Sequence, residues 1–164
     1  MHSLALEIDY AHESAGWIKC ELIVDGERHP LDASNVFPPF LPLLRFVKAV
    51  AGQRFPARFF WDEEGVGAHF EAIAVAENSP LVHLKIQHEE AAEPWLDADI
   101  ERETVVQAFL PPVVEMSQNF LLAEKEWHIP GRVVARIQES IARGIPLRSD
   151  IHTPQYVEFI VRGG

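Results

Sequence analysis

Residues 55–88 read FPARFFWDEEGVGAHFEAIAVAENSPLVHLKIQH and contain three segments of strand character separated by two short polar turns. The segments are Phe55 to Trp61, Val66 to Val75 and Leu81 to His88, and the turns are Asp62-Glu63-Glu64-Gly65 and Glu77-Asn78-Ser79-Pro80. Connections this short join antiparallel strands, because parallel neighbours need a crossover of a dozen or more residues. The segment therefore predicts an antiparallel meander and argues against a doubly wound parallel sheet.

The chain before the meander has the pattern of three more strands. Residues 4–10 and 17–24 alternate apolar and polar types, as half-buried strands do. Asp25-Gly26 favours the positive φ of a tight turn, so we expect Glu27 to Leu31 to fold back as an edge strand carrying Pro30.

A helix is expected between these strands and the meander. After Pro38 and Pro39, apolar residues recur at helical spacing from Phe40 to Ala51, and Gly52 follows as a C-cap. Arg45 and Lys48 fall outside the apolar stripe, so we expect them on the solvated side of this helix.

Four segments follow the meander. Residues 89–103 hold seven acidic residues and one basic residue, and are expected to form a connection or surface flap. From Val106 to Leu121 the helical period continues across Pro111-Pro112, which fits either one bent helix or two abutting helices. Val133 to Gly144 predicts a last helix, and Gln155 to Arg162 predicts a final strand.

The expected order of elements is β-β-β-α-β-β-β-α-α-β. It corresponds to an α+β fold with a mostly antiparallel sheet of about six or seven strands and helices packed on one face. No repeat or linker divides the sequence, so we expect residues 1–164 to form a single domain. Apolar types make up 48% and charged types 24%, a composition typical of globular chains that fold alone.

The sequence contains no uncharged apolar run of 18 residues and no basic region preceding an apolar run at its N-terminus. We therefore expect a cytoplasmic protein without a membrane span. Cys20 is the only cysteine, which excludes an intrachain disulfide, and its place between Ile18 and Leu22 on one strand face predicts burial as a small hydrophobe.

Charge restricts the class of partner. The chain has 14 Lys and Arg against 25 Asp and Glu, a formal net charge of −11. Such a field repels nucleic acid and anionic lipid and attracts basic proteins. The sequence also lacks the Gly-rich phosphate-binding loops, the Gly-x-Ser-x-Gly nucleophile motif and the His-Glu-x-x-His zinc motif, so we predict no catalytic residue and no cofactor.

One group in the meander has the composition of a metal site. A two-residue turn at Asn78-Ser79 would place His69 opposite His88, with Glu71 on the same face. Two imidazoles and a carboxylate match the three protein ligands of a catalytic zinc ion. The alternative is that both histidines lie at the end of a core face, because the rest of that face is apolar: Ile73, Val75, Val82, Leu84 and Ile86. A shift of one residue in register would also separate the two histidines.

Two further sets of residues are candidates for binding. The acidic turn and flap, with an adjacent aromatic residue, are the predicted contact with a basic partner: Asp62, Glu63, Glu64, Glu89, Glu90, Glu93 and Trp95. Arg132, Arg136 and Arg143 share one stripe of the last helix, which is either a solvated face or a site for phosphate or carboxylate groups.

Three functions remain open from the sequence. The leading hypothesis is a non-enzymatic interaction domain that neutralises or scaffolds a basic protein, since small acidic α+β chains of this kind resemble bacterial toxin-neutralising and other interaction domains. The second is a small-molecule-binding or metal-dependent hydrolytic domain with a pocket near His69, Glu71 and His88. The third is a structural homo-oligomer subunit, which an apolar patch on an uncovered sheet face would indicate.

Overall fold

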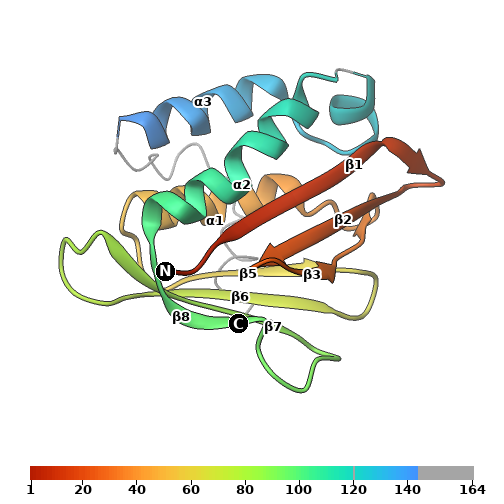
Figure 1. Ribbon diagram of the computed structural model, residues 1–164. Coiled ribbons are helices and arrows are strands. Elements are labelled where there is room, and N and C mark those ends of the chain that lie inside the picture. The colour runs from red at the N-terminus through yellow and green to blue at the C-terminus, as the bar shows by residue number, and fades with distance from the viewer. Residues whose placement is uncertain (120, 144–164) are drawn as a thin grey trace.

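The computed structural model describes residues 1–119 and 121–143, which form an α+β fold with two antiparallel four-stranded sheets. Figure 1 shows how the sheets and helices are arranged. Sheet A consists of β1 (Leu4–Ser14), β2 (Trp17–Val24), β3 (Glu27–Pro30) and β4 (Ala33–Ser34). Sheet B consists of β5 (Ala57–Asp62), β6 (Gly67–Ala74), β7 (Leu81–His88) and β8 (Leu96–Glu101). The helices are α1 (Phe40–Ala51), α2 (Arg102–Ser117) and α3 (Gly131–Ala142), with a π-helical segment η1 (Leu121–Glu126) before α3.

Sheet A forms where the alternating pattern predicts it. β1 pairs with β2 in a register that sets Leu6 opposite Leu22, and both side chains are buried. The other neighbours of β2 are β3 and the short β4, which pair with different halves of it. Cys20 is buried on the same face, and burial raises the pKa of its thiol, as expected for a core position rather than a reactive one.

Sheet B has the strand order β5-β6-β7-β8, so the predicted meander is extended by one strand. Its inner face carries Phe59, Phe70, Leu84 and Ile100 at alternating positions, and all of them are buried. Figure 1 places the three α-helices on the same side of sheet B. The sheet therefore has one face in the core and one face that carries charged and polar side chains.

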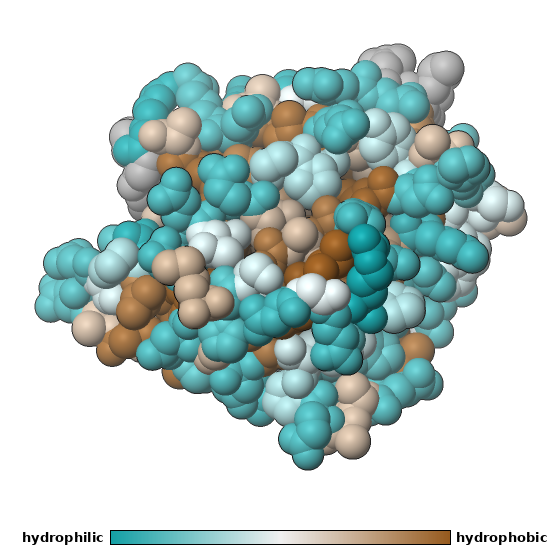
Figure 2. Space-filling view, in the orientation of Figure 1, coloured by the Kyte–Doolittle hydropathy of each residue, from teal (hydrophilic) through white to brown (hydrophobic). Residues whose placement is uncertain are grey.

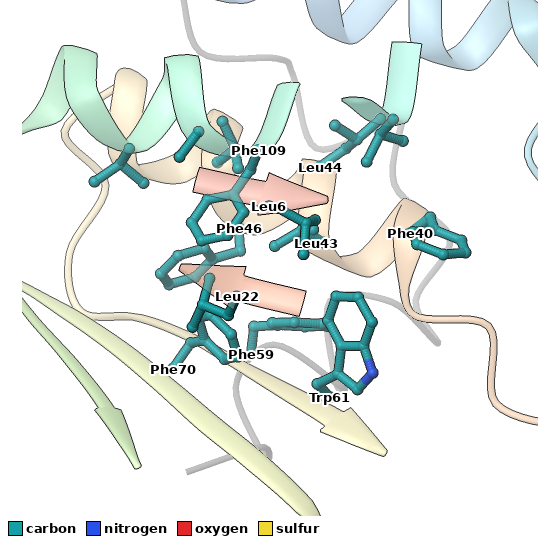
Figure 3. Packing of buried hydrophobic residues seen from close by; sticks show 14 of the residues in the cluster. Leu6, Leu22, Phe40, Leu43, Leu44, Phe46, Phe59, Trp61, Phe70 and Phe109 are labelled. Carbon is teal, nitrogen blue, oxygen red and sulfur yellow. The ribbon is translucent and has the colours of Figure 1, made fainter. Parts of the chain in front are cut away.

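The helices form the other layer of the core. α1 packs against β5, α2 and α3, and α2 also lies along β1. Ten of the twelve residues of α1 are buried, which makes it the central element of the molecule. Seven fully buried aromatic rings join the helices to sheet B, as Figure 3 shows in part: Phe40, Phe46, Phe59, Trp61, Phe70, Phe109 and Trp127.

The position of α1 corrects one expectation. Arg45 and Lys48 are each only 3% exposed, so the prediction that they form a solvated side is wrong. Because α1 is covered on more than one side, its polar positions are enclosed as well as its apolar stripe. Burial, with Arg45 and Arg54 close by, lowers the pKa of Lys48 to about 7.

The second half of the chain differs from expectation at three points. The acidic segment 89–103 is not only a connection, because it contains β8, and the two-residue strand β4 was also not predicted. α2 continues through Pro111 and Pro112 as one helix that ends at Ser117, and η1 follows it. α3 ends at Ala142, while the predicted final strand Gln155 to Arg162 lies outside the described residues.

The face drawn in Figure 2 is mostly hydrophilic, and its apolar residues gather near the centre and at the left edge. Ile73, near the end of β6, and Val75, just after it, are 41% and 42% exposed, so their predicted place on the core face is wrong. Along residues 1–119 and 121–143, the structure contains no helix with the length and apolarity needed to cross a bilayer.

Candidate acidic binding site

Two acidic turns that are distant in sequence meet at one end of sheet B. The β5–β6 and β7–β8 connections both leave the sheet at this end, because the strands between them run antiparallel. The Glu89 N–H donates to the Gly67 carbonyl oxygen at 2.9 Å, which joins the two turns directly. We call this surface the acidic rim, and it consists of Asp32, Asp62, Glu63, Glu64, Glu89, Glu90 and Glu93.

The β5–β6 turn that carries half of the rim depends on a glycine. A Cβ atom on Gly67 would lie 1.9 Å from the backbone oxygen of Trp61, far inside any real contact distance. Only glycine allows the two strands to approach this closely at the turn. The position of Asp62, Glu63 and Glu64 relative to the sheet is therefore set by the backbone.

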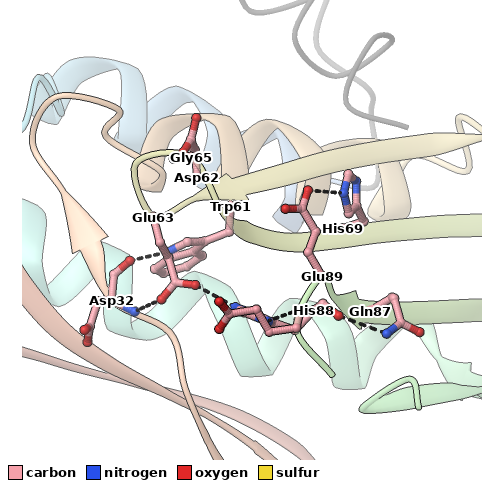
Figure 4. A network of polar contacts seen from close by, with 10 residues as sticks. Asp32, Trp61, Asp62, Glu63, Gly65, His69, Gln87, His88 and Glu89 are labelled. Carbon is pink, nitrogen blue, oxygen red and sulfur yellow. Dashed lines mark hydrogen bonds and ion pairs between the residues drawn. The ribbon is translucent and has the colours of Figure 1, made fainter. Parts of the chain in front are cut away.

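Glu63 connects the two sheets, as Figure 4 shows. Its Oε1 accepts the Asp32 backbone N–H at 2.8 Å, and its Oε2 lies 2.7 Å from His88 Nε2. Beside it, the Trp61 indole N–H donates to the Asp32 carbonyl oxygen at 2.9 Å. Hydrogen bonds to a charged carboxylate are stronger than neutral ones, so these contacts hold the chain between β3 and β4 against the β5–β6 turn.

His88 is held at both ring nitrogens. Nδ1 lies 3.1 Å from the Glu90 backbone N–H, which can only donate, and this assigns the ring proton of the neutral form to Nε2, where it is donated to Glu63. Neither nitrogen is open to take a proton from a substrate. This arrangement gives His88 a structural role and removes it as a general base.

Aromatic side chains line the same region. The Trp95 indole stacks on His29 and on His88, with ring centroids 4.6 Å and 5.0 Å apart. Because His29 belongs to sheet A and His88 to sheet B, this stack is a second contact between the sheets. The rim and the stack enclose an open hollow of about 440 Å³, lined by Trp17, Asp32, Glu63, His88, Glu90 and Trp95.

The residues predicted to contact a partner all lie at this end of the sheet, but they are not equivalent. The side chains of Glu63 and Glu64 accept hydrogen bonds within the protein, from the Asp32 N–H and, at 2.5 Å, from the Ser34 hydroxyl. Asp62 accepts the Gly65 N–H, and Glu89 lies 2.9 Å from His69 Nε2. The side chains of Glu90 and Glu93 are exposed.

The predicted metal group is not assembled. The Ala76 carbonyl accepts the Ser79 N–H and Asn78 has a positive φ, so the turn differs from the two-residue one expected. His69 therefore pairs with Gln87, and His88 pairs with Ala68. His69 and His88 consequently point to opposite faces of sheet B.

The third predicted ligand, Glu71, forms an ion pair with Arg58 at 2.6 Å. Across the described part of the chain, no group of three or more His, Cys, Asp or Glu side chains is placed to hold a metal ion. Of the three residues predicted to share a pocket, His88 lines the hollow at the rim, and His69 and Glu71 do not line it.

The arginine stripe lies on α3, on the opposite side of the molecule from the β7–β8 turn in Figure 1. Arg132 and Arg136 are exposed, and Arg143 is paired with Glu139 one turn earlier. The stripe therefore does not neutralise the acidic rim. Its use as an anion site stays a prediction.

Comparisons with protein-family models, with curated proteins and with solved structures found no match.

Two parts of the site were not singled out from the sequence. Asp32 follows a short edge strand and carries no motif, and its place at the rim depends on how sheet A packs on sheet B. His29 has no signal either, because its stacking partner Trp95 is 66 positions away in the sequence. Both residues enter the site through contacts between the sheets, which periodicity does not encode.

Proposed function

We propose that the protein is a binding protein without catalytic function whose acidic rim engages a basic protein partner, which it neutralises or scaffolds. The observation that carries this proposal is the convergence of the two acidic turns at one end of sheet B. Acidic residues separated by more than 20 positions in sequence thereby form one continuous surface.

The chemistry of the rim suits a protein ligand. Glu90 and Glu93 are exposed, and the hydrogen bonds of Glu63 and Glu64 to Asp32 and Ser34 hold the neighbouring β5–β6 turn in place. Trp95 is half-buried and held by two stacked rings, so it adds apolar contact area without a large loss of side-chain entropy on binding. Aromatic residues of this kind are enriched at protein interfaces.

The net charge supports the same class of partner. A surface with this density of carboxylates, on a chain of net charge −11, repels nucleic acid and steers basic proteins toward it. Because the Debye length falls from about 8 Å at 0.15 M to about 3 Å at 1 M salt, binding through the rim should weaken as salt is added.

The test is affinity capture from a native lysate at low and high salt, using the wild-type chain and the triple variant Glu89→Gln, Glu90→Gln, Glu93→Gln. We expect a retained basic protein, identified by mass spectrometry, that is lost from the wild-type chain at high salt and from the variant at low salt.

The matched control removes the same number of charges away from the rim: Glu27→Gln, Glu77→Gln and Glu126→Gln, all exposed. This control should retain the same protein as the wild-type chain. Equal loss of the partner from both triple variants would show that net charge matters and the rim does not, and would contradict the proposal.

A further inference from the structure

The hollow at the acidic rim has walls of two different kinds. Its lining includes two tryptophans, Trp17 at the start of β2 and Trp95, and three acidic residues, Asp32, Glu63 and Glu90. Its volume of about 440 Å³ lies within the range of side-chain and small-ligand sites, although the hollow is open to solvent. Flat apolar walls beside negative charge favour a cation that has an apolar, planar face.

The carboxylates of the hollow differ in how they are used. Both oxygens of Glu63 are engaged by Asp32 and His88. Among the described residues, the side-chain oxygens of Asp32 and Glu90 accept no hydrogen bond and form no ion pair, although the backbone of both residues is bonded. The carboxylates of Asp32 and Glu90 can therefore accept hydrogen bonds from a ligand, and the backbone that carries them is already fixed.

We propose that this hollow receives an arginine side chain of the basic partner, an inference that rests on the function proposed above. A guanidinium group is planar, stacks on aromatic faces and offers paired N–H donors to carboxylates, whereas a lysine ammonium is a compact and more strongly hydrated charge. The Trp17 indole provides the stacking surface, and Asp32 and Glu90 accept the N–H donors.

The hollow is organised before any partner arrives. Asp32 is held through its backbone N–H and C=O by Glu63 and Trp61, and Trp95 is held by its two imidazole neighbours. Groups that are already fixed lose little conformational entropy on binding. The arginine would consequently act as a central anchor, surrounded by the weaker charge contacts of the rim.

The test uses Nα-acetyl-arginine amide as the probe, with the indole N–H resonance of Trp17 followed by NMR. We expect a saturable shift with the arginine compound, a several-fold weaker response with Nα-acetyl-lysine amide, and none with the neutral isostere Nα-acetyl-citrulline amide. Asp32→Asn should weaken arginine binding about tenfold, the effect of removing one charge-assisted hydrogen bond.

Glu77→Gln is the matched control, because it removes an exposed charge that belongs neither to the acidic rim nor to the lining of the hollow; it should bind the arginine compound like the wild type. Asp32→Asn keeps the backbone contacts of Asp32, and its unfolding curve checks that it folds. An equal response to the citrulline compound, or unchanged affinity in Asp32→Asn, overturns the proposal. Nona-arginine distinguishes failure of the arginine site from failure of the proposed function. If this peptide binds in a salt-sensitive way but the single arginine compound gives no Trp17 response, only the arginine site is overturned. If neither the peptide nor the arginine compound binds, both proposals are overturned.

Discussion

At the scale of single residues, Glu63 links the two sheets. It is one of three acidic residues in a turn, yet its side chain is only 14% exposed and accepts hydrogen bonds from sheet A and from β7. A carboxylate in this position stabilises the fold and also fixes the shape of the acidic rim. In the proposed binding, Glu63 would therefore act indirectly, through the positions of Asp32 and His88.

Glu63→Ala should lower the free energy of unfolding by about 2–3 kcal/mol, because it leaves the Asp32 N–H and the His88 Nε2–H without their acceptor. Urea denaturation followed by circular dichroism measures this change. Glu93→Ala, on the exposed part of the same rim, should stay within about 0.5 kcal/mol of the wild type. Equal midpoints for the two variants would show that the link does not stabilise the fold.

His83 gives the protein a defined pH response on the outer face of sheet B. Its Nδ1 lies 2.7 Å from Asp99 and its Nε2 2.8 Å from Asp97. These hydrogen bonds, that to Asp99 above all, raise the pKa of His83 above its ordinary value. The contribution of protonated His83 to folding stability is therefore complete below the pKa of this side chain in the unfolded chain, near 6.5. It is lost as the pH rises through the higher pKa of His83 in the folded protein.

An NMR titration of the His83 ring should show a lower pKa in Asp99→Asn than in the wild type. Glu101→Gln is the control, since Glu101 lies on the same strand and pairs with Leu81 rather than with His83. A His83 pKa that falls equally in both variants would assign the effect to general charge and not to the contact with Asp99.

At the scale of elements, regular alternation and helical spacing were sufficient to predict β2, α1 and β7. β8 was missed although Leu96, Ala98 and Ile100 alternate with Asp97, Asp99 and Glu101, because acidic residues are depleted in strands and suggested a connection. At a sheet edge such charges are common, since they prevent pairing with another chain.

The candidate site was predictable in part. The acidic residues themselves follow from the sequence, but their convergence requires the strand order. The hydrogen bonds of Glu63 and Glu64 to Asp32 and Ser34 require the contact between the sheets. The pairing of His69 with His88 failed by one position, because the β6–β7 turn is not the two-residue turn assumed. Local pattern fixes the face of a residue only when the turn geometry is known.

The two faces of sheet B should differ in what they contribute to stability. Phe70 is 1% exposed and contacts the rings of Phe46, Phe59 and Phe109. Phe70→Ala should lower the free energy of unfolding by about 3–5 kcal/mol, as for other buried aromatic residues. Phe60→Ala, on the outer face beside His69, should cost clearly less, and similar losses in urea denaturation would contradict the assigned faces.

At the scale of the whole molecule, charge is distributed unevenly. The acidic rim lies at one end of sheet B, while the exposed Arg132 and Arg136 lie on α3 at the opposite side. In the proposed function, an asymmetric field of this kind would orient an approaching basic protein toward the rim before contact. The net charge of −11 is therefore not spread evenly over the surface, and the electrostatic field of the protein has a direction.

The most direct measurement is a map of backbone amide shifts as nona-arginine is added at low salt, repeated at high salt. The largest shifts should fall in residues 62–66 and 89–95 and beside Asp32, and they should disappear at high salt. Shifts spread evenly over all acidic surfaces, or concentrated at Asp97 and Asp99 of β8, would show that the acidic rim is not the binding surface.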